Sequence, residues 1–321
     1  MAGASSKLVI YAALAGNAAV ALVKFVAAFW TGSSAMLSEA IHSSVDTADQ
    51  ALMLYGLKRA QRPPDETHPL GYGRELYFWS FTVALLIFTL GAGLTAYEGI
   101  QHVIRPHELS NPFVSYIVYA AAAVFEGASW YMALREFRKT KGELGYFEAM
   151  RKSKDPPTFI VLFEDTAALI GLAIAAAGTF GATQLHAPVI DGIASIGIAI
   201  LLGATALVLA RESKDLLIGE PARPELAAAV LRTAREVDGI ERAQVVFSVH
   251  LAPQQVVIAL SLEFRDDMTA NDIEAAVDVL EARIQERHAD VIAVFVKPEH
   301  TTDPLILPGR FPRRARAAGR R

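Results

Sequence analysis

Residues 38–50 read Ser-Glu-Ala-Ile-His-Ser-Ser-Val-Asp-Thr-Ala-Asp-Gln, which places polar side chains inside an otherwise apolar stretch. Its ionisable residues, Glu39, His42, Asp46 and Asp49, follow one another at spacings of three, four and three. At about 100° per residue, a helix places all four within an arc of about 80° on one face. A charged group at mid-membrane costs about 2.5 to 3.5 kcal/mol unless something compensates it. A divalent cation is the natural compensator, so the stretch predicts a cation-binding membrane helix.

The composition of the whole chain supports a membrane protein. The 321 residues are 53% hydrophobic and only 20% charged, with a mean hydropathy of +0.31, which is too apolar for an average soluble protein. The chain contains no cysteine. A disulfide framework, a thiolate zinc site and a cysteine nucleophile are therefore excluded, and any metal must be held by nitrogen and oxygen ligands.

Apolar runs of about 20 residues predict six membrane spans. They cover residues 8–30, 34–57, 77–100, 112–134, 158–180 and 188–210. Lys and Arg gather in the loops after the second and fourth spans, whereas the opposite loops carry only Arg105. Because basic loops stay on the cytoplasmic side, both termini are predicted to be cytoplasmic. Residues 1–218 are predicted to form this transmembrane domain.

Residues 219–303 are more polar and predict a soluble domain. A helix is expected to begin at Pro224, and a second helix is expected to be capped by Thr269. Three strands are predicted, the last over residues 291–296. On the first strand Val245, Phe247, Val249 and Leu251 share one face, and on the second Ile258, Leu260, Leu262 and Phe264 do so. The order αββαβ indicates a small α+β domain of ferredoxin-like type.

Residues 304–321 form a basic tail, with six arginines among the last twelve residues. A disordered tail is the ordinary interpretation of such a segment. Contact with anionic lipid on the cytoplasmic leaflet is the sharper alternative. Nucleic-acid binding is not expected, because the tail belongs to a membrane protein and lacks a recognition fold.

Several motifs of this sequence, together with the predicted spans and soluble domain, resemble those of the cation diffusion facilitator family. They are Glu39-Ala-Ile-His42-Ser-Ser-Val-Asp46, His68-Pro-Leu-Gly-Tyr-Gly73-Arg74, Lys24, Asp191-Gly-Ile-Ala-Ser195 and Leu162-Phe-Glu-Asp-Thr-Ala-Ala168. The last motif is similar to the zinc transporter nine-like branch and its bacterial relatives. The resemblance implies a multi-pass, homodimeric protein of the cell (inner) membrane, which exports divalent metal, usually Zn²⁺, in exchange for protons.

In that family the transport site lies between the second and fifth spans. His42 and Asp46 match the ligands of the second span, and Asp165 matches one ligand of the fifth. The family places a histidine or aspartate four residues before Asp165, where this chain has Val161, which cannot coordinate metal. Glu164 is the nearby substitute. Because it is adjacent to Asp165, the two side chains point about 100° apart on a regular helix, so Asp49 and a water molecule compete for the fourth position.

The residue types fit several divalent metals. Neutral imidazole with carboxylates suits Zn²⁺, and a mixed nitrogen and oxygen set also accepts Fe²⁺, Co²⁺ or Ni²⁺, while oxygen alone favours Mn²⁺. No organic cofactor is expected. Metal binding needs a neutral histidine and ionised carboxylates, so protons and metal compete for the same groups. Proton-coupled exchange follows as a hypothesis.

The other ionisable residues of the spans have structural alternatives. Glu39 is either an exit-path ligand or an interfacial acid, and Asp49 can accept a hydrogen bond from a neighbouring helix. Asp191 is expected to cap the sixth span rather than to bind ions. Lys24 and Glu98 fall at similar depth, which favours structural ion pairs. Glu126 is unexplained: it is a proton carrier, a partner for Lys24, or a buried protonated acid.

Outside the spans, Asp65 and His68 suggest a second, weaker metal site in the loop after the second span. The presence of Tyr72 where some relatives have another histidine weakens that hypothesis, and His68 has the alternative role of capping or anchoring the third span. His250, His288 and His300 are candidate metal ligands of the soluble domain, although a lone strand histidine is usually a packing or surface residue.

Two other functional classes compete with a transporter. A membrane-anchored metal sensor would use the soluble domain for regulation, but it would not need an acidic stripe at mid-membrane. An intramembrane hydrolase would need its own constellation, and the chain contains neither His-Glu-x-x-His nor Gly-x-Ser-x-Gly. The sequence therefore predicts a secondary transporter rather than an enzyme.

Overall fold

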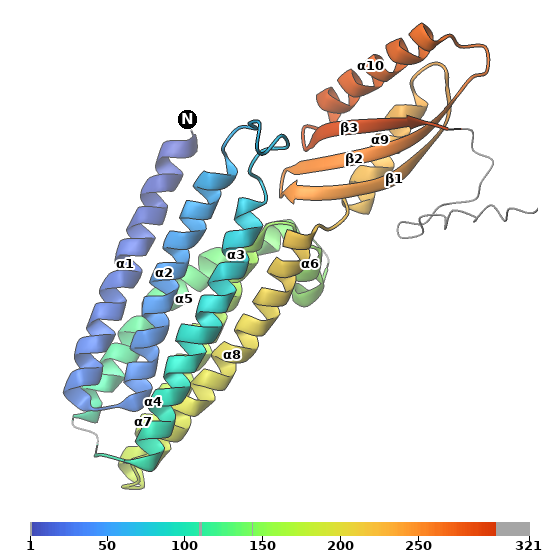
Figure 1. Cartoon of the computed structure of the whole chain (residues 1–321). Coiled ribbons are helices and arrows are strands. Elements are labelled where there is room, and N and C mark those ends of the chain that lie inside the picture. The colour runs from blue at the N-terminus through green and yellow to red at the C-terminus, as the bar shows by residue number, and fades with distance from the viewer. Residues whose placement is uncertain (1, 109–110, 143, 300–321) are drawn as a thin grey trace, which may run out of the picture. The chain divides into compact units, whose positions relative to one another are not determined.

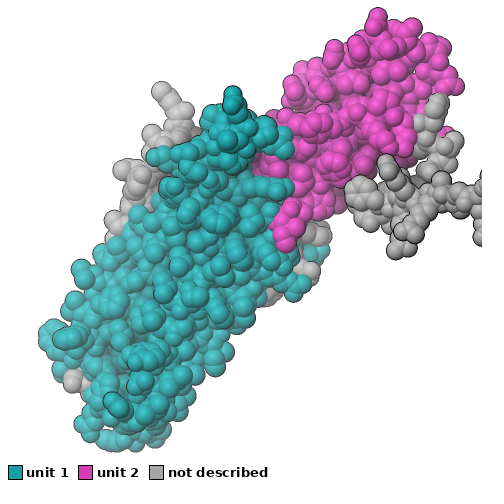
Figure 2. Space-filling view, in the orientation of Figure 1, with its two compact units in different colours: residues 1–217 teal, residues 218–321 magenta. Residues whose placement is uncertain are grey.

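The computed structural model describes residues 2–108, 111–142 and 144–299 (Figure 1). The chain divides into two compact units, residues 1–217 and 218–321, which Figure 2 shows in different colours. His300 and the basic tail at 304–321 lie outside the described residues.

The first unit is made of helices that run along one another (Figure 1). The long ones are α1 (Ala2–Thr31), α2 (Ser34–Ala60), α5 (Pro112–Lys141), α7 (Pro156–Gln184) and α8 (Val189–Ile218). A further continuous stretch consists of α3 (Glu75–Leu86), the π-helical segment η1 (Ile87–Ala92) and α4 (Gly93–Ile104). A short helix, α6 (Tyr146–Lys152), follows α5. The sequence did not predict α6, since this basic segment has no apolar run.

Among the described residues, four helical stretches are long and apolar enough to cross a membrane. They are Glu75–Ile104, Pro112–Arg135, Phe159–Gln184 and Val189–Ile218. Helix α1 contributes a shorter apolar stretch, Asn17–Thr31, and α2 is interrupted by its ionisable stripe. The predicted spans at residues 8–30 and 34–57, which correspond to α1 and α2, therefore stay predictions. Large apolar side chains point outward, with Phe29 95% exposed, as expected of helices surrounded by lipid.

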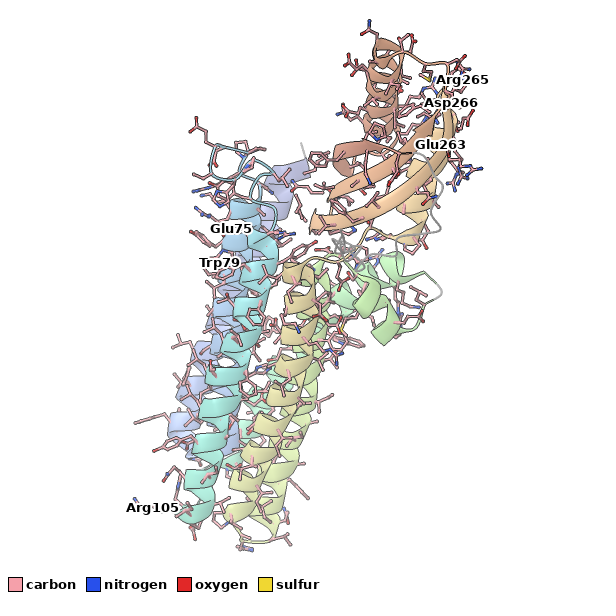
Figure 3. All side chains as sticks on the ribbon, turned by 45° about the vertical axis from the view of Figure 1, so that its right-hand side comes forward. Glu75, Trp79, Arg105, Glu263, Arg265 and Asp266 are labelled. Atoms are coloured by element: carbon pink, nitrogen blue, oxygen red, sulfur yellow. The ribbon has the colours of Figure 1, made fainter. Side chains whose placement is uncertain are left out.

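Polar side chains lie at both ends of the stretch made of α3, η1 and α4. Glu75, at its start, accepts hydrogen bonds from Arg59 of α2 (2.7 Å) and from the indole of Trp79 (2.8 Å). Arg105 lies at the opposite end of the stretch (Figure 3). Tryptophan is typical of the membrane–water interface, where its ring and its N–H meet different surroundings. These side chains are consistent with a stretch that spans the apolar layer.

Helix α2 contacts α1, α3, α4 and α7, and α5 packs along α7 and α1. These contacts bring the polar stripe of α2 next to α7. Two apolar clusters surround the contact region, one including Tyr77 and Phe159 and the other including Met36 and Ile198.

The second unit contains α9 (Pro224–Arg235), β1 (Ile240–Ala252), β2 (Gln255–Phe264), α10 (Ala270–Arg287) and β3 (Val291–Pro298), in the predicted order αββαβ. The sheet has the order β1-β2-β3, with β1 antiparallel and β3 parallel to β2. Its core includes Val230, Ile258, Leu260, Leu280 and Ile284. Thr269 caps α10 as predicted, in a capping box with Asp272.

One strand prediction is wrong. The apolar face predicted for β2 is buried as expected, but on β1 Phe247 is 50% exposed. The pairing of β1 with β2 shifts between Val245 and Phe247. A bulge of this kind adds one residue to a strand and moves the following side chains to the other face, which a strict alternation cannot predict.

Candidate metal centre

The predicted stripe lies on α2 as one buried face. Glu39, His42 and Asp49 are buried, and Asp46 is 17% exposed. His42 and Asp46 are one helical turn apart, with 3.3 Å between Nδ1 and Oδ1. The prediction of a single helical face is therefore confirmed.

Asp165 of α7 faces the same small cavity as Asp46. The cavity has a volume of ≈ 20 Å³, which is room for one water-sized guest. The hydroxyl of Ser129 on α5 donates to Oδ2 of Asp165 at 2.8 Å. This bond fixes one carboxylate oxygen, so α5 helps to orient a candidate ligand on α7.

Glu164 is buried next to Asp165 on α7. Asp165 lines the cavity that it shares with Asp46, whereas Glu164 is not among the lining residues. This division agrees with the angle of about 100° between adjacent helical residues.

Several polar atoms of these residues are buried without a hydrogen-bond partner among the described residues. They are both ring nitrogens of His42, Oδ1 of Asp46, both carboxylate oxygens of Asp49 and Oε1 of Glu164. Nδ1 of His42 and Oδ1 of Asp46 lie 3.3 Å apart, but their geometry does not make a hydrogen bond. Buried polar groups are normally satisfied, and each exception needs an explanation. A bound cation would satisfy these atoms, since imidazole nitrogen and carboxylate oxygen are its usual ligands.

The candidate ligands do not converge on one point: Asp46 and Asp165 line the cavity, and His42 and Glu164 are not among its lining residues. Within the described part of the chain, no three His, Asp or Glu side chains are close enough to hold one metal ion. Binding of one cation by three or more of these side chains therefore requires them to move from the positions described here. Val161 packs against the apolar cluster that contains Phe159, so it offers no ligand.

Lys24 of α1 is fully buried among polar partners near this centre. Its Nζ lies 3.2 Å from Oε2 of Glu39, 2.8 Å from Oγ of Ser43 and 2.6 Å from Oε1 of Glu126. The predicted similarity in depth with Glu98 does not produce a pair with Glu98. The alternative of Glu126 as the partner of Lys24 is confirmed. Ser129 was missed, although it lies three residues after Glu126 and so shares its helical face.

Asp191 does not cap its own helix, so that prediction is wrong. Its carboxylate accepts the backbone N–H of Ala35 at 3.0 Å and the hydroxyls of Ser33 and Thr179. Ser33 is the N-cap of α2. Asp191 of α8 thus stabilises the start of the neighbouring helix, because the two helix ends meet in the folded unit.

The loop residues Asp65 and His68 make hydrogen bonds and a ring contact with other residues of the loop between α2 and α3. Asp65 accepts hydrogen bonds from Thr67, from the N–H of His68 and, at 2.6 Å, from the hydroxyl of Tyr72. These donors, Tyr72 first, hold the pKa of Asp65 well below its ordinary value. His68 packs on Tyr72 with ring centroids 4.2 Å apart. It does not cap α3, whose N-cap is Arg74.

The histidines of the second unit have structural contacts. The ring of His250 is buried, and its Nδ1 lies 3.2 Å from the carbonyl oxygen of Ala252. His288 follows α10, with Nε2 3.4 Å from the hydroxyl of Thr233. These positions are typical of packing and capping residues, so metal binding by His250 stays a prediction without further support.

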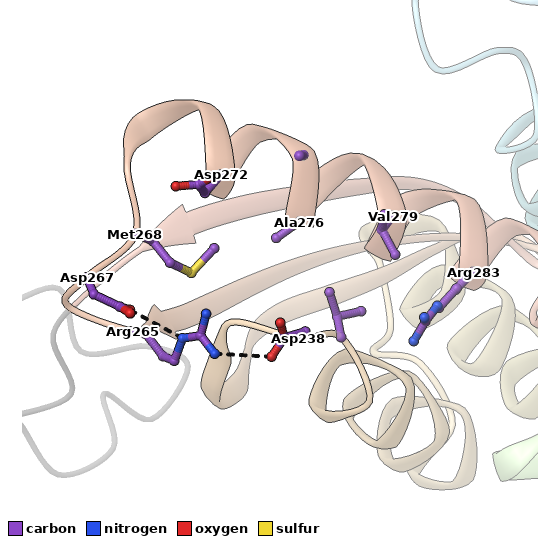
Figure 4. A pocket seen from close by; sticks show the side chains of 10 residues that line it. Asp238, Arg265, Asp267, Met268, Asp272, Ala276, Val279 and Arg283 are labelled. Carbon is purple, nitrogen blue, oxygen red and sulfur yellow. Dashed lines mark hydrogen bonds and ion pairs between the residues drawn. The ribbon is translucent and has the colours of Figure 1, made fainter.

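The second unit also contains a larger cavity, of ≈ 460 Å³, beside α10 (Figure 4). Its charged groups largely satisfy one another. Arg265 lies 3.3 Å from both Asp238 and Asp267, as the dashed lines in Figure 4 mark. The cavity therefore lacks the unsatisfied polar atoms that distinguish the centre between α2 and α7.

The fold and the buried polar centre define a multi-pass membrane protein with a candidate cation site. Residues 10–218, more than half of the chain, match the family described as the cation efflux transmembrane domain. The chain belongs to this family of cation efflux transporters, which are secondary transporters rather than enzymes.

Three relatives show the range of similarity. The mitochondrial proton-coupled zinc antiporter SLC30A9 of Xenopus laevis is 32% identical over 88% of this chain and 58% of its own length. Metal tolerance protein C4 of Arabidopsis thaliana is 34% identical over 72% of this chain and 51% of its length. Magnetosome protein MamB of Paramagnetospirillum magneticum is 24% identical over 90% of this chain and 93% of its own length. The chain therefore spans little more than half the length of the first two relatives.

Proposed function

We propose that this protein exports a divalent transition-metal cation, with Zn²⁺ as the principal cargo, in exchange for protons. The observation that carries the proposal is the set of buried, unsatisfied imidazole and carboxylate atoms on facing helices α2 and α7. His42, Asp46 and Asp165 are the proposed ligands, with Glu164 as the fourth. The name of the Xenopus relative supports zinc and proton coupling.

The finer features of the proposal rest on the sequence. The apolar runs favour six spans, and the basic loops favour cytoplasmic termini. The cell (inner) membrane is the location that the resemblance to the family implies. The resemblance to the family favours a homodimer. Fe²⁺, Co²⁺, Mn²⁺ and Ni²⁺ are alternative cargoes, because nitrogen and oxygen ligands accept all of them. Glu39 and Asp49 are proposed to line the path on the two sides of the ligands.

A transport assay across these metals tests the proposal. Purified protein is reconstituted in vesicles that contain a metal-sensitive dye, and uptake is compared between the wild type, Asp46→Ala and Asp165→Ala. Both variants are expected to lose zinc uptake. Asp215→Asn is the matched control, since the side chain of Asp215 on α8 is 42% exposed and pairs with Lys214. Normal zinc uptake by both site variants would overturn the proposed site, and metal binding without uptake by the wild type would indicate an anchored sensor.

A further inference from the structure

Three carboxylates from three helices line the small cavity beside the candidate ligands. Asp46 comes from α2, Glu126 from α5 and Asp165 from α7. Resting on the transport function proposed above, we propose that Glu126 is a further ligand of the transported cation. It supplies the charge that Val161 cannot, and Lys24 is its counter-ion while the site is empty.

The first support is the unequal number of charges around Lys24. One buried ammonium group faces two carboxylates, Glu39 and Glu126, each of which it binds through a single oxygen. The other oxygens, Oε1 of Glu39 and Oε2 of Glu126, have no hydrogen-bond partner in the described part of the chain. Buried carboxylates need compensation by charge and by hydrogen bonds. The network can therefore accept more positive charge.

The second support is the position of the two acids relative to the cavity. Glu126 lines it and Glu39 does not. The free Oε1 of Glu39 instead packs against Gly171 of α7, where an added Cβ would lie only 2.6 Å away. Glu39 is thus confined between helices and holds Lys24, whereas Glu126 lies between Lys24 and the space that Asp46 and Asp165 share.

From this arrangement we expect the partners of Glu126 to change when a cation enters the cavity. In the structure Oε1 of Glu126 lies 2.6 Å from the ammonium nitrogen of Lys24. A divalent cation in the cavity attracts Glu126, and Glu39 and Ser43 remain as the partners of Lys24. The charge of Glu126 is thus neutralised in both states. Added to His42, Asp46, Asp165 and Glu164, Glu126 is a fourth carboxylate, and such a ligand set is richer in oxygen than a typical zinc site and extends the cargo towards Fe²⁺ and Mn²⁺.

Equilibrium binding of Zn²⁺ to the full chain in detergent tests this inference. Glu126→Gln keeps the shape of the side chain, and its amide oxygen still accepts a hydrogen bond from Lys24. It is expected to weaken Zn²⁺ binding at least about tenfold, because even indirect partners of a metal site contribute tenfold or more. Glu39→Gln is the comparison variant, since it also removes one acid beside Lys24 but lies outside the cavity. As a proposed path residue Glu39 affects the rate of transport, so we expect a much smaller effect on equilibrium binding.

Equal weakening of Zn²⁺ binding in the two variants would overturn the inference, because Glu126 would then act only through Lys24. No weakening in Glu126→Gln would also overturn it. Asp46→Asn, measured in parallel, separates this failure from failure of the transport site. If Asp46→Asn weakens binding and Glu126→Gln does not, only the role of Glu126 is wrong. If Asp46→Asn binds normally, the proposed site itself is wrong. The visible spectrum of bound Co²⁺, which reports its ligands, is expected to differ between Glu126→Gln and the wild type.

Discussion

Single residues of the candidate site depend on partners from other helices. Sequence periodicity predicted the face that carries His42 and Asp46, because the spacing of residues along one helix is fixed by its geometry. It could not predict that Ser129 holds Asp165, and it gave the contact between Lys24 and Glu126 only as one of three alternatives, since these contacts depend on which helices are neighbours. The spacing of the ligands along one helix can thus be predicted from the sequence, but the side chains that orient the ligands cannot.

Ser129→Ala tests the orientation of Asp165. Loss of the 2.8 Å hydrogen bond is expected to cost about 1 to 2 kcal/mol, which corresponds to a rise of about five- to thirtyfold in the KM for Zn²⁺ uptake. Ser44→Ala is the control, because Ser44 of α2 donates only to the backbone of Ala40. An unchanged KM in Ser129→Ala would show that Asp165 needs no support from α5.

The titration of Asp65 tests its hydrogen bond from Tyr72 in the loop between α2 and α3. Its pKa is lowered, chiefly by the hydroxyl of Tyr72. Its contribution to loop stability is therefore complete above the ordinary aspartate pKa of about 3.9 and is lost as the pH falls through the lower value of the folded state. Carbon NMR of labelled aspartate is expected to show titration below about 3.9, and Tyr72→Phe to move it upward. Titration at the same pH in both proteins would contradict this explanation.

At the scale of elements, the sequence was most reliable where one residue sets a boundary. Thr269 begins α10 through its own side chain, as predicted. Asp191 was assigned to the wrong helix because its carboxylate reaches across to Ala35 of α2, a tertiary contact that has no signature in the sequence. The bulge that exposes Phe247 on β1 is likewise set by pairing with β2.

Asp191→Ala is expected to loosen the start of α2. It leaves the N–H of Ala35 and the hydroxyls of Ser33 and Thr179 without their acceptor, at a cost of at least about 2 kcal/mol. Hydrogen exchange at Ala35 and Met36 is expected to become at least about tenfold faster, while Asp215→Ala, elsewhere on the same helix, leaves it unchanged. Unaltered exchange in Asp191→Ala would show that the cap of α2 is independent of α8.

At the scale of the whole molecule, composition and hydropathy predicted a helical membrane part followed by an αββαβ part, and both are present. The family match ends at residue 218, so the proposed transport function rests on the first unit. Charge is the property that connects this unit to its cargo. A centre with unsatisfied carboxylates can be neutralised by a metal ion or by protons, and competition between the two is the basis of the exchange that we propose.

Transport under an imposed pH gradient tests this central claim most directly. Vesicles containing the protein are loaded with Zn²⁺, a pH gradient is imposed, and the zinc flux is followed before and after an ionophore collapses the gradient. Exchange predicts that the gradient drives zinc movement, and that its collapse removes that drive. Zinc movement unaffected by collapse of the gradient would contradict proton-coupled exchange.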